Sequence, residues 1–343
     1  MAQQLSLPFL SNLGGGHITA RKRFLDKLSR HIDFEAFRER LRSFFNYGRY
    51  GRPHYDVVLM FKILVLQSCY GLSDDSMQDA IIDSNAFQHF LGLGCADRVP
   101  DSRTIRNFRL GLGAEGVRSL FDDFNGRLVG MGTKVSKGTI IDSSFVEAPK
   151  QRNTPEENRQ IKEEGKTPEE WSEKKTRHKD KDARWTKKGG ERHYGYKNHA
   201  AVDLRTGLVE NWTVTPANVH DSQVCEELIN EGKNHVFADS AYNSEENRQA
   251  LKKRGVNPAF IKRRYRGRPD LTEQEKEANR KLSSKRCRIE HVFGAMKQMG
   301  GDIVRSIGLA RCIIRVGLVN LAYNMKRVCF LIESGQLCLR KAS

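Results

Sequence analysis

Residues 285–297, KRCRIEHVFGAMK, hold one acidic side chain among bases at a spacing that only a helix explains. At roughly 100° per residue, Arg286 lies roughly 40° and Lys297 roughly 20° from Glu290 around the helix axis, so the three share one face. Three apolar residues give this helix a surface with which to dock: Val292, Phe293 and Met296. A carboxylate between two cations is most simply a surface ion pair, unless other acidic residues converge on it.

Two aspartates upstream lie where a buried strand should carry no charge. Residues 138–146, GTIIDSSFV, have the β-branched composition of a strand, and Asp142 follows its two isoleucines. The short apolar run 236–238, VFA, is typical of a central strand and ends at Asp239. Because an unpaired aspartate is costly to bury, Asp142 needs a partner cation.

The order of the expected elements is three strands, a helix, a strand, a helix, a strand and a long helix. Asp142 lies on the first strand, Asp239 at the end of the fourth, and Glu290 on the last helix. This is the order of an α/β RNase H-like fold, a mixed five-stranded sheet with helices whose first and fourth strands are central neighbours. We therefore expect Asp142 and Asp239 side by side, with Glu290 facing them.

An all-α region precedes the strands. Residues 101–109 begin a helix that Ser102 can cap, and they place Arg103 and Arg106 on its outward side, as in a helix-turn-helix recognition helix. A helical bundle with solvated arginines is an equally good interpretation. We predict a helical DNA-binding or dimerisation domain at 1–130 and a catalytic domain at 131–343. The latter would contain a charged, exposed insertion at about 149–190 and a helical extension at about 304–335.

The charge of the chain indicates a polyanionic partner. Lys and Arg number 59 against 42 acidic residues, a net charge of +17 with a pI near 9.6. Between residues 251 and 290 there are 14 bases and 5 acids, a net +9 that exceeds half of the total. An even, solubilising surface would not concentrate charge in this way, so we expect binding to nucleic acid.

Cysteine usage and hydropathy favour a cytoplasmic, nucleoid-associated protein. The seven cysteines are widely spaced without a CxxC pair, which predicts reduced thiols and no zinc knuckle. The first residues lack the features of a secretory signal. No uncharged apolar run approaches about 18 residues, so we expect no membrane span.

Three converging carboxylates would repel one another by roughly 4 kcal/mol per pair at 4 Å and an effective dielectric of 20. Hard divalent cations remove this penalty, because Mg²⁺ prefers oxygen ligands. Two such ions can stabilise the attacking and leaving oxygens of a phosphoryl displacement. The motifs of serine hydrolases, P-loop ATPases and zincins are absent from the sequence. The pattern therefore predicts metal-dependent phosphodiester chemistry.

At these motifs the chain resembles bacterial insertion-sequence DDE transposases of the IS5 family, within the IS4-like group. The resemblance covers most of the chain. It rests on these stretches, among others: Val99-Pro100-Asp101-Ser102-Arg103-Thr104-Ile105, Tyr194-Gly195-Tyr196-Lys197-Asn198-His199, Ala238-Asp239-Ser240-Ala241-Tyr242 and Arg286-Cys287-Arg288-Ile289-Glu290. The signature of the family places Tyr three residues before the Arg, and this chain has Ser283 there.

The resemblance implies a DDE triad that binds Mg²⁺ or Mn²⁺, with two ions per site: Asp142, Asp239 and Glu290. It also implies three contacts to DNA phosphates, from Arg286, Lys297 and Lys197. The partner would be double-stranded DNA, both terminal inverted repeats and target, bound by a homodimer or a larger assembly. The endonuclease reaction would expose a 3′-hydroxyl at the end of the element, and that hydroxyl would then attack target DNA.

Two other functions remain open from the residues. A DNA-binding repressor or architectural protein derived from a transposase would share the basic patches but would not need the carboxylates. A structure-selective RNase H-like nuclease would share the site without strand transfer.

Overall fold

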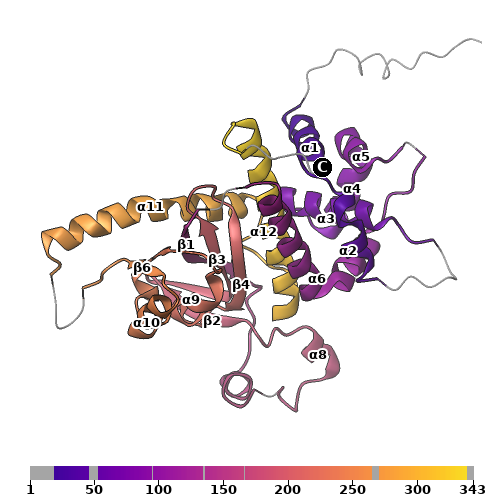
Figure 1. Ribbon diagram of the computed structural model, residues 1–343. Coiled ribbons are helices and arrows are strands. Elements are labelled where there is room, and N and C mark those ends of the chain that lie inside the picture. The colour runs from indigo at the N-terminus through magenta and orange to yellow at the C-terminus, as the bar shows by residue number, and fades with distance from the viewer. Residues whose placement is uncertain are drawn as a thin grey trace, which may run out of the picture.

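The computed structural model describes residues 19–45, 53–94, 96–133, 136–165, 167–264 and 270–337. Helices form its first part (Figure 1). They are α1 (Ala20–His31), the 3-10 turn η2 (Glu35–Phe37), α2 (Arg38–Arg42), α3 (Val57–Tyr70), α4 (Asp74–Asp83), α5 (Asn85–Leu91) and α6 (Ser102–Gly130). The expected all-α region at the start of the chain is therefore present.

Short polar side chains begin these helices. The Asp56 carboxylate caps α3, which is buried on nearly all sides and ends at Gly71 with a φ of 64°. The cap of α6 is Asp101, which accepts the Thr104 N–H at 2.6 Å, and not Ser102 as the sequence suggested. A carboxylate is also favoured there by the helix dipole.

A single glycine divides α6. Gly113 has φ 63° and ψ −175°, a conformation that a side chain would strain, so the helix breaks between its two halves. The helix that the sequence predicts to begin at residues 101–109 is thus followed, beyond Gly113, by a second helical half that ends at Gly130. Ile105 and Phe108 of the first half are buried, whereas Arg103 and Arg106 are exposed.

The second part of the chain forms a mixed sheet. Its strands are β1 (Gly138–Glu147), β2 (Arg184–Lys188), β3 (Glu191–Asp203), β4 (Val209–Pro216), β5 (His235–Ala238) and β6 (Asn257–Phe260). The order is β2-β3-β1-β5-β6, and β4 also pairs with β3. β1 is antiparallel to β3 and parallel to β5, which is parallel to β6. The expected RNase H-like order, with the first and fourth of its five strands adjacent, is confirmed by β1 and β5.

One strand was not predicted. β2 comes from the end of the charged segment that we expected to be an exposed insertion, and it pairs antiparallel with the start of β3. Trp185 of β2 is 42% exposed and contacts the Tyr194 ring at a centroid distance of 5.0 Å. The sheet therefore has six strands rather than five.

Helices cover both faces of the sheet. On one face, Ile141 and Ala238 pack with residues of α9 (Cys225–Leu228, after the 3-10 turn η4, Asp221–Val224) and α10 (Glu245–Lys253). On the other face, Ile140 and Phe237 belong to the core that includes α11 (Glu273–Gln298) and α12 (Leu309–Glu333). Side chains alternate along β1, so Asp142 points to the same face as Ile140, toward α11.

The helix α12 joins the two parts of the molecule. Figure 1 shows it between the sheet and the N-terminal helices, and one continuous core includes residues of α1, α3, α6, α12 and the sheet. Gly317 marks the closest approach: a Cβ there would lie 2.5 Å from Val117 of α6 and 2.7 Å from Trp212 of β4. The helical region and the sheet thus share buried surface.

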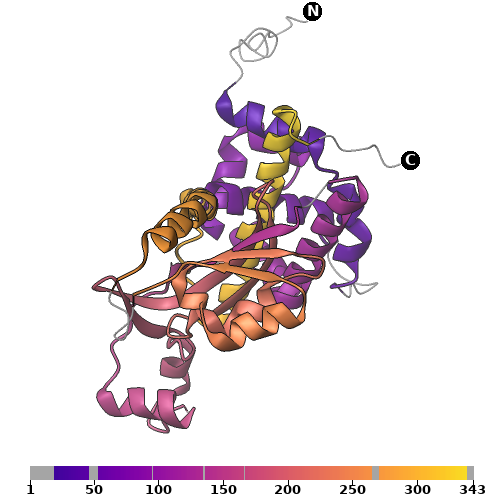
Figure 2. The same cartoon turned by 60° about the vertical axis from the view of Figure 1, so that its left-hand side comes forward.

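The charged segment before β2 projects from the body of the molecule (Figure 2). It contains α7 (Pro155–Arg159), the π-helical turn η3 (Gln160–Glu164) and α8 (Glu173–Arg177). Trp171 is only 7% exposed, and its indole N–H donates to Glu157 at 2.7 Å. Lys175 donates to the same carboxylate oxygen, so a local cluster orders a segment that is poor in apolar residues.

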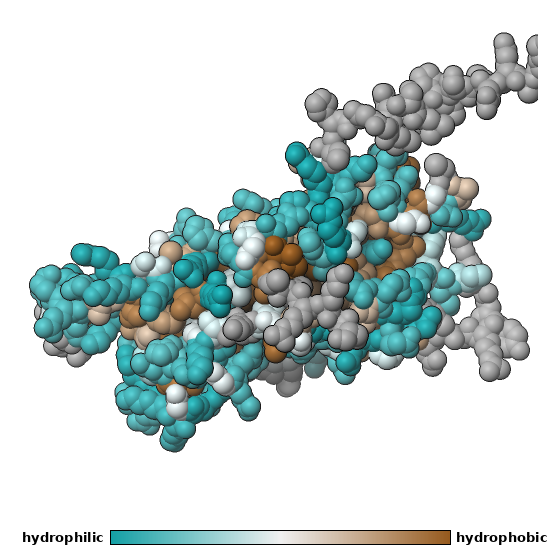
Figure 3. Space-filling view, turned by 45° about the horizontal axis from the view of Figure 1, so that its top comes forward, coloured by the Kyte–Doolittle hydropathy of each residue, from teal (hydrophilic) through white to brown (hydrophobic). Residues whose placement is uncertain are grey.

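Cys69, Cys225, Cys287, Cys312 and Cys329 are free thiols, and the other two cysteines lie outside the described residues. Across the described part of the chain, no single helix has the length and apolar composition for crossing a membrane. Among the same described helices, the pair α3 and α4, bent by 103° at the break between them, meets the length and composition criteria when the two are taken together. Figure 3 shows a largely hydrophilic face, with apolar surface gathered near its middle.

Candidate active site

The parallel pairing of β1 with β5 brings Asp142 and Asp239 to the same level of the sheet. The register pairs Ile140 with Phe237, and Asp142 and Asp239 each follow that pair by two residues. The negative charge of Asp239 acts on the carboxyl of Asp142 and adds to the rise in its pKa. Asp239 follows the last residue of β5 and accepts the N–H of Ala241 at 2.8 Å, as the cap of the 3-10 turn η5 (Ser240–Tyr242). Two aspartates of adjacent central strands therefore lie together.

Arg286 of α11 reaches Asp142 from above the sheet. Its guanidinium donates to Oδ2 of Asp142 at 2.8 Å, and the two side chains are 14% or less exposed. Oδ1 accepts the N–H of Ser143 at 2.8 Å. Burial raises the pKa of Asp142, while the positive charge of Arg286 opposes that rise and the negative charge of Asp239 adds to it. The cation that the sequence required for Asp142 is thus Arg286.

Glu290 lies one turn beyond Arg286 on α11 and is exposed. Ile289, Val292 and Met296 are buried and dock the helix, so the rotation of α11 turns Arg286 toward Asp142. Within the described ranges, no group of three or more His, Cys, Asp or Glu side chains is close enough to hold a metal ion. The structure therefore brings two of the expected carboxylates together and sets a guanidinium beside them.

The donor chemistry of this place nevertheless suits a hard divalent cation. Asp142 and Asp239 offer carboxylate oxygens, the ligands that Mg²⁺ prefers. The guanidinium of Arg286 already shows that a positive charge is accepted against Oδ2 of Asp142.

Lys197 is buried instead of facing solvent. Its ammonium group donates to Oδ1 of Asp221 and to the Val219 carbonyl, both at 2.8 Å. The residue as a whole is 8% exposed. Burial by itself would raise the pKa of Asp221. The hydrogen bond from Lys197 and its positive charge outweigh that effect, so the pKa of Asp221 is lowered. Buried His199 has Nδ1 3.9 Å from the same carboxylate oxygen. This arrangement explains why a lysine can lie inside the sheet.

Tyr242 was not predicted as part of the site. Its hydroxyl is buried without a hydrogen-bond partner among the described residues. Burial raises the pKa of Tyr242 well above its usual value, and the charges of Asp221, Asp142 and Asp239 add to the rise. The signal in the sequence was its place three residues after Asp239. A buried hydroxyl of this kind can donate to a carboxylate or to a water inside the protein.

The remaining expected DNA contacts lie on the surface. Lys297 is exposed and 3.7 Å from Asp302, and Arg103 and Arg106 are exposed on α6. His220 is not one of these expected contacts. Its Nδ1 hydrogen-bonds the Ser222 hydroxyl at 2.8 Å in the turn before α9, which is a structural role.

Strand order and paired aspartates together define a protein of the RNase H-like class. A family model described as "Transposase DDE domain" matches residues 133–325, and one described as "Transposase domain (DUF772)" matches residues 15–110. Since the first covers more than half of the 343 residues, the chain belongs to the transposase DDE domain family. Its function is that of a transposase, an enzyme that cleaves phosphodiester bonds and transfers strands.

One solved structure that resembles the chain is titled "Cryo-EM structure of piggyBac transposase synaptic complex with hairpin DNA". The two share 12% sequence identity, with a TM-score of 0.43 over 94% of this chain and 76% of that one.

Proposed function

We propose that the chain is an insertion-sequence transposase of the IS5 family whose catalytic carboxylates are Asp142, Asp239 and Glu290. They would hold Mg²⁺ or Mn²⁺, two ions per site. The observation that supports the proposal is the proximity of Asp142, on β1, to Asp239, which follows the adjacent parallel strand β5 and whose charge acts on Asp142. The basic residues around Glu290 and the net charge of +17 support a DNA substrate. Ser283, in place of the signature Tyr, sets this chain apart from the family pattern.

Bound metal would supply Lewis-acid stabilisation of the oxygens that attack and leave phosphorus. In the hydrolytic step, a water oxygen bonds to phosphorus and the 3′-oxygen leaves, which yields a 3′-hydroxyl. In the transfer step, that hydroxyl attacks a target phosphorus and a target 3′-oxygen leaves. The positive charge of Arg286 opposes the rise in the pKa of Asp142 that burial causes, and the buried hydroxyl of Tyr242 has no hydrogen-bond partner among the described residues.

We propose that the exposed basic side chains of α11 and α6 contact DNA. They are Lys297, Arg103 and Arg106. For Lys197 and Arg286, both held by aspartates here, a phosphate would have to compete with Asp221 or Asp142. We further propose that residues 1–130 recognise terminal inverted repeats or mediate dimerisation. Residues 131–343 would catalyse, on DNA of the bacterial nucleoid, as a dimer or larger assembly.

The test uses the single variants Asp142→Asn, Asp239→Asn and Glu290→Gln. Each should abolish Mg²⁺-dependent cleavage of a labelled duplex copied from the DNA flanking the coding frame, while DNA binding persists in a gel-shift assay. Glu273→Gln is the matched control, because Glu273 is an exposed carboxylate on the same helix as Glu290.

Retained cleavage in any one variant would remove that residue from the mechanism. Cleavage by the wild type without joining to a second duplex would favour the nuclease alternative, and binding without any product would favour a repressor or architectural protein.

A further inference from the structure

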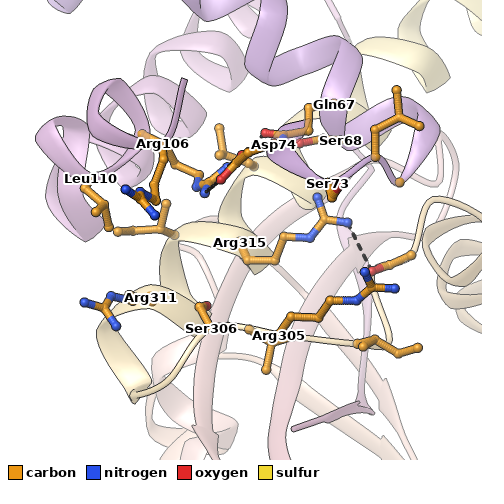
Figure 4. Close-up of a pocket in the computed structure, with 18 of the residues that line it drawn as sticks. Gln67, Ser68, Ser73, Asp74, Arg106, Leu110, Arg305, Ser306, Arg311 and Arg315 are labelled. Atoms are coloured by element: carbon orange, nitrogen blue, oxygen red, sulfur yellow. Dashed lines mark hydrogen bonds and ion pairs between the residues drawn. The ribbon is translucent and has the colours of Figure 1, made fainter. Parts of the chain in front are cut away.

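A cavity of about 650 Å³ lies between the N-terminal helices and the segment that joins α11 to α12. Figure 4 shows Arg106 and Leu110 projecting from α6 on one side, and Arg305 and Arg311 from the α11–α12 segment and the start of α12 on the other. Arg315 lies between them. The cavity is separate from the carboxylates of the candidate active site, and none of the catalytic steps above uses it.

The lining of this cavity is strongly cationic. It contains five arginines and one acidic residue, Asp74. Arg109 is neutralised by Asp74, to which its guanidinium donates twice, at 2.6 and 2.8 Å. Among the ion pairs of the described residues, four lining arginines have no carboxylate partner: Arg106, Arg305, Arg311 and Arg315. Uncompensated guanidinium groups that converge on a cavity need an anion.

Arg315 is held in place by carbonyl groups only. Its Nη2 donates to the carbonyl oxygens of Met299 and Gly300 at 3.2 and 3.1 Å. Burial, together with the neighbouring positive charges of Arg109 and Arg305, lowers the pKa of Arg315 to about 10. A bound anion would relieve this crowding of like charges.

The N-terminus of α12 is already occupied. The backbone N–H groups of Gly308 and Leu309 donate to Asp180 and Asp182 at 3.0 and 2.9 Å. An anion in the cavity would therefore be bound by guanidinium side chains and not by the helix terminus.

We propose that this cavity binds backbone phosphates of DNA, a site additional to the phosphate contacts near the carboxylates. The proposal rests on the transposase function above. Ile303 of the cavity wall bridges to Glu147 at the end of β1, five residues beyond Asp142. Five residues of strand span roughly 17 Å, which corresponds to about five nucleotides at 3.4 Å each. The same strand of DNA can thus reach both places.

Two partly exposed apolar residues suit the sugar units between phosphates. Leu110 is 40% and Ile303 50% exposed, and both line the cavity beside the arginines. A small inorganic anion would not need them, whereas a nucleic-acid strand would cover them.

The test measures DNA binding by the double variant Arg305→Ala/Arg311→Ala, since both side chains are exposed and their loss spares the core. Fluorescence anisotropy is followed over a KCl series with two probes, a random-sequence duplex and a duplex copied from the DNA flanking the coding frame. Removing two phosphate contacts should reduce the magnitude of the negative slope of log K against log[KCl] by about 1.8, and reduce the affinity about 60-fold near 0.1 M salt.

The control is Lys162→Ala/Lys174→Ala, which removes two exposed charges from the projecting segment before β2. A slope change in the Arg305/Arg311 variant that exceeds the control supports the proposal. Loss on both probes assigns the site to DNA in general, and loss on the flanking duplex alone assigns it to the end of the element. Equal slopes in the two variants would overturn the proposal. Failure of the catalytic assignment is seen separately, as retained cleavage in the Asp142→Asn variant.

Discussion

Lys197 offers the sharpest test of how the site is built, because the sequence suggested a DNA contact and the structure buries it. The perturbation is Lys197→Met, which keeps the aliphatic length and removes the ammonium group. Lys197 and Asp221 have side chains only 10% and 9% exposed and are 2.8 Å apart. The substitution would leave the Asp221 carboxylate buried without its cation.

The expected cost follows from this burial. Breaking a buried ion pair by removing one partner destabilises a protein by about 3–5 kcal/mol. His199 lies 3.9 Å from Asp221, but in the wild type burial lowers the pKa of His199 to about 4, so the imidazole is neutral near pH 7 and Lys197 alone supplies the positive charge. Adding Asp221→Asn removes the stranded charge. The double variant should therefore recover more than half of the lost free energy of unfolding.

Urea denaturation of the wild type, both single variants and the double variant gives the coupling energy, which we expect at about 2–3 kcal/mol. Arg42→Ala, in an exposed pair with Glu39, is the matched control and should cost less than about 1 kcal/mol. A Lys197→Met cost below about 1 kcal/mol, or strictly additive effects, would refute the buried-pair explanation. If the folded Lys197→Met variant also showed a slope of log K for DNA against log[KCl] that is smaller in magnitude by about 0.9, Lys197 would be a phosphate contact.

Three further predictions concern stability. Burial lowers the pKa of His199 from 6.5 to about 4, so the folded protein binds fewer protons than the unfolded chain between these values. Stability should fall as the pH drops from 6.5 toward 4, and His199→Gln should flatten this dependence in urea titrations at several pH values; an unchanged profile would exclude His199 as its source. Gly317→Ala should cost about 1–3 kcal/mol by overpacking against Val117 and Trp212, and an unaltered melting curve would contradict the close approach. Trp171→Ala should expose the segment before β2 to limited proteolysis without lowering global stability, whereas loss of global stability would show that this segment packs on the core.

Much of the sheet was predictable because its signals are local. The β-branched run before Asp142 and the apolar run before Asp239 identify two buried strands, and the order of elements makes them neighbours. β2 was missed because residues 184–188 are mostly charged or polar, and only pairing with β3 makes them a strand. The pairing of β2 with β3 depends on tertiary context, and the local β-propensity of residues 184–188 does not predict it.

The site was predictable in part. Helical spacing places Arg286 and Glu290 on one face, but which of them meets Asp142 depends on the rotation of α11, which buried Ile289 and Val292 fix. The partner of Lys197 lies 24 residues away in a turn that is rich in Asn, His and Asp, residues that commonly form turns whatever their contacts. Contacts of this kind depend on side-chain packing across the fold, so the sequence alone did not assign them.

The most direct measurement is Mn²⁺ binding to the DNA-bound protein by electron paramagnetic resonance. The wild type should bind Mn²⁺, and Asp142→Asn and Asp239→Asn should each lose most of that binding, with a smaller loss for exposed Glu290→Gln. The Glu273→Gln control should bind as the wild type does. Undiminished Mn²⁺ binding in both aspartate variants would contradict the assignment of these carboxylates as the metal site of the transposase.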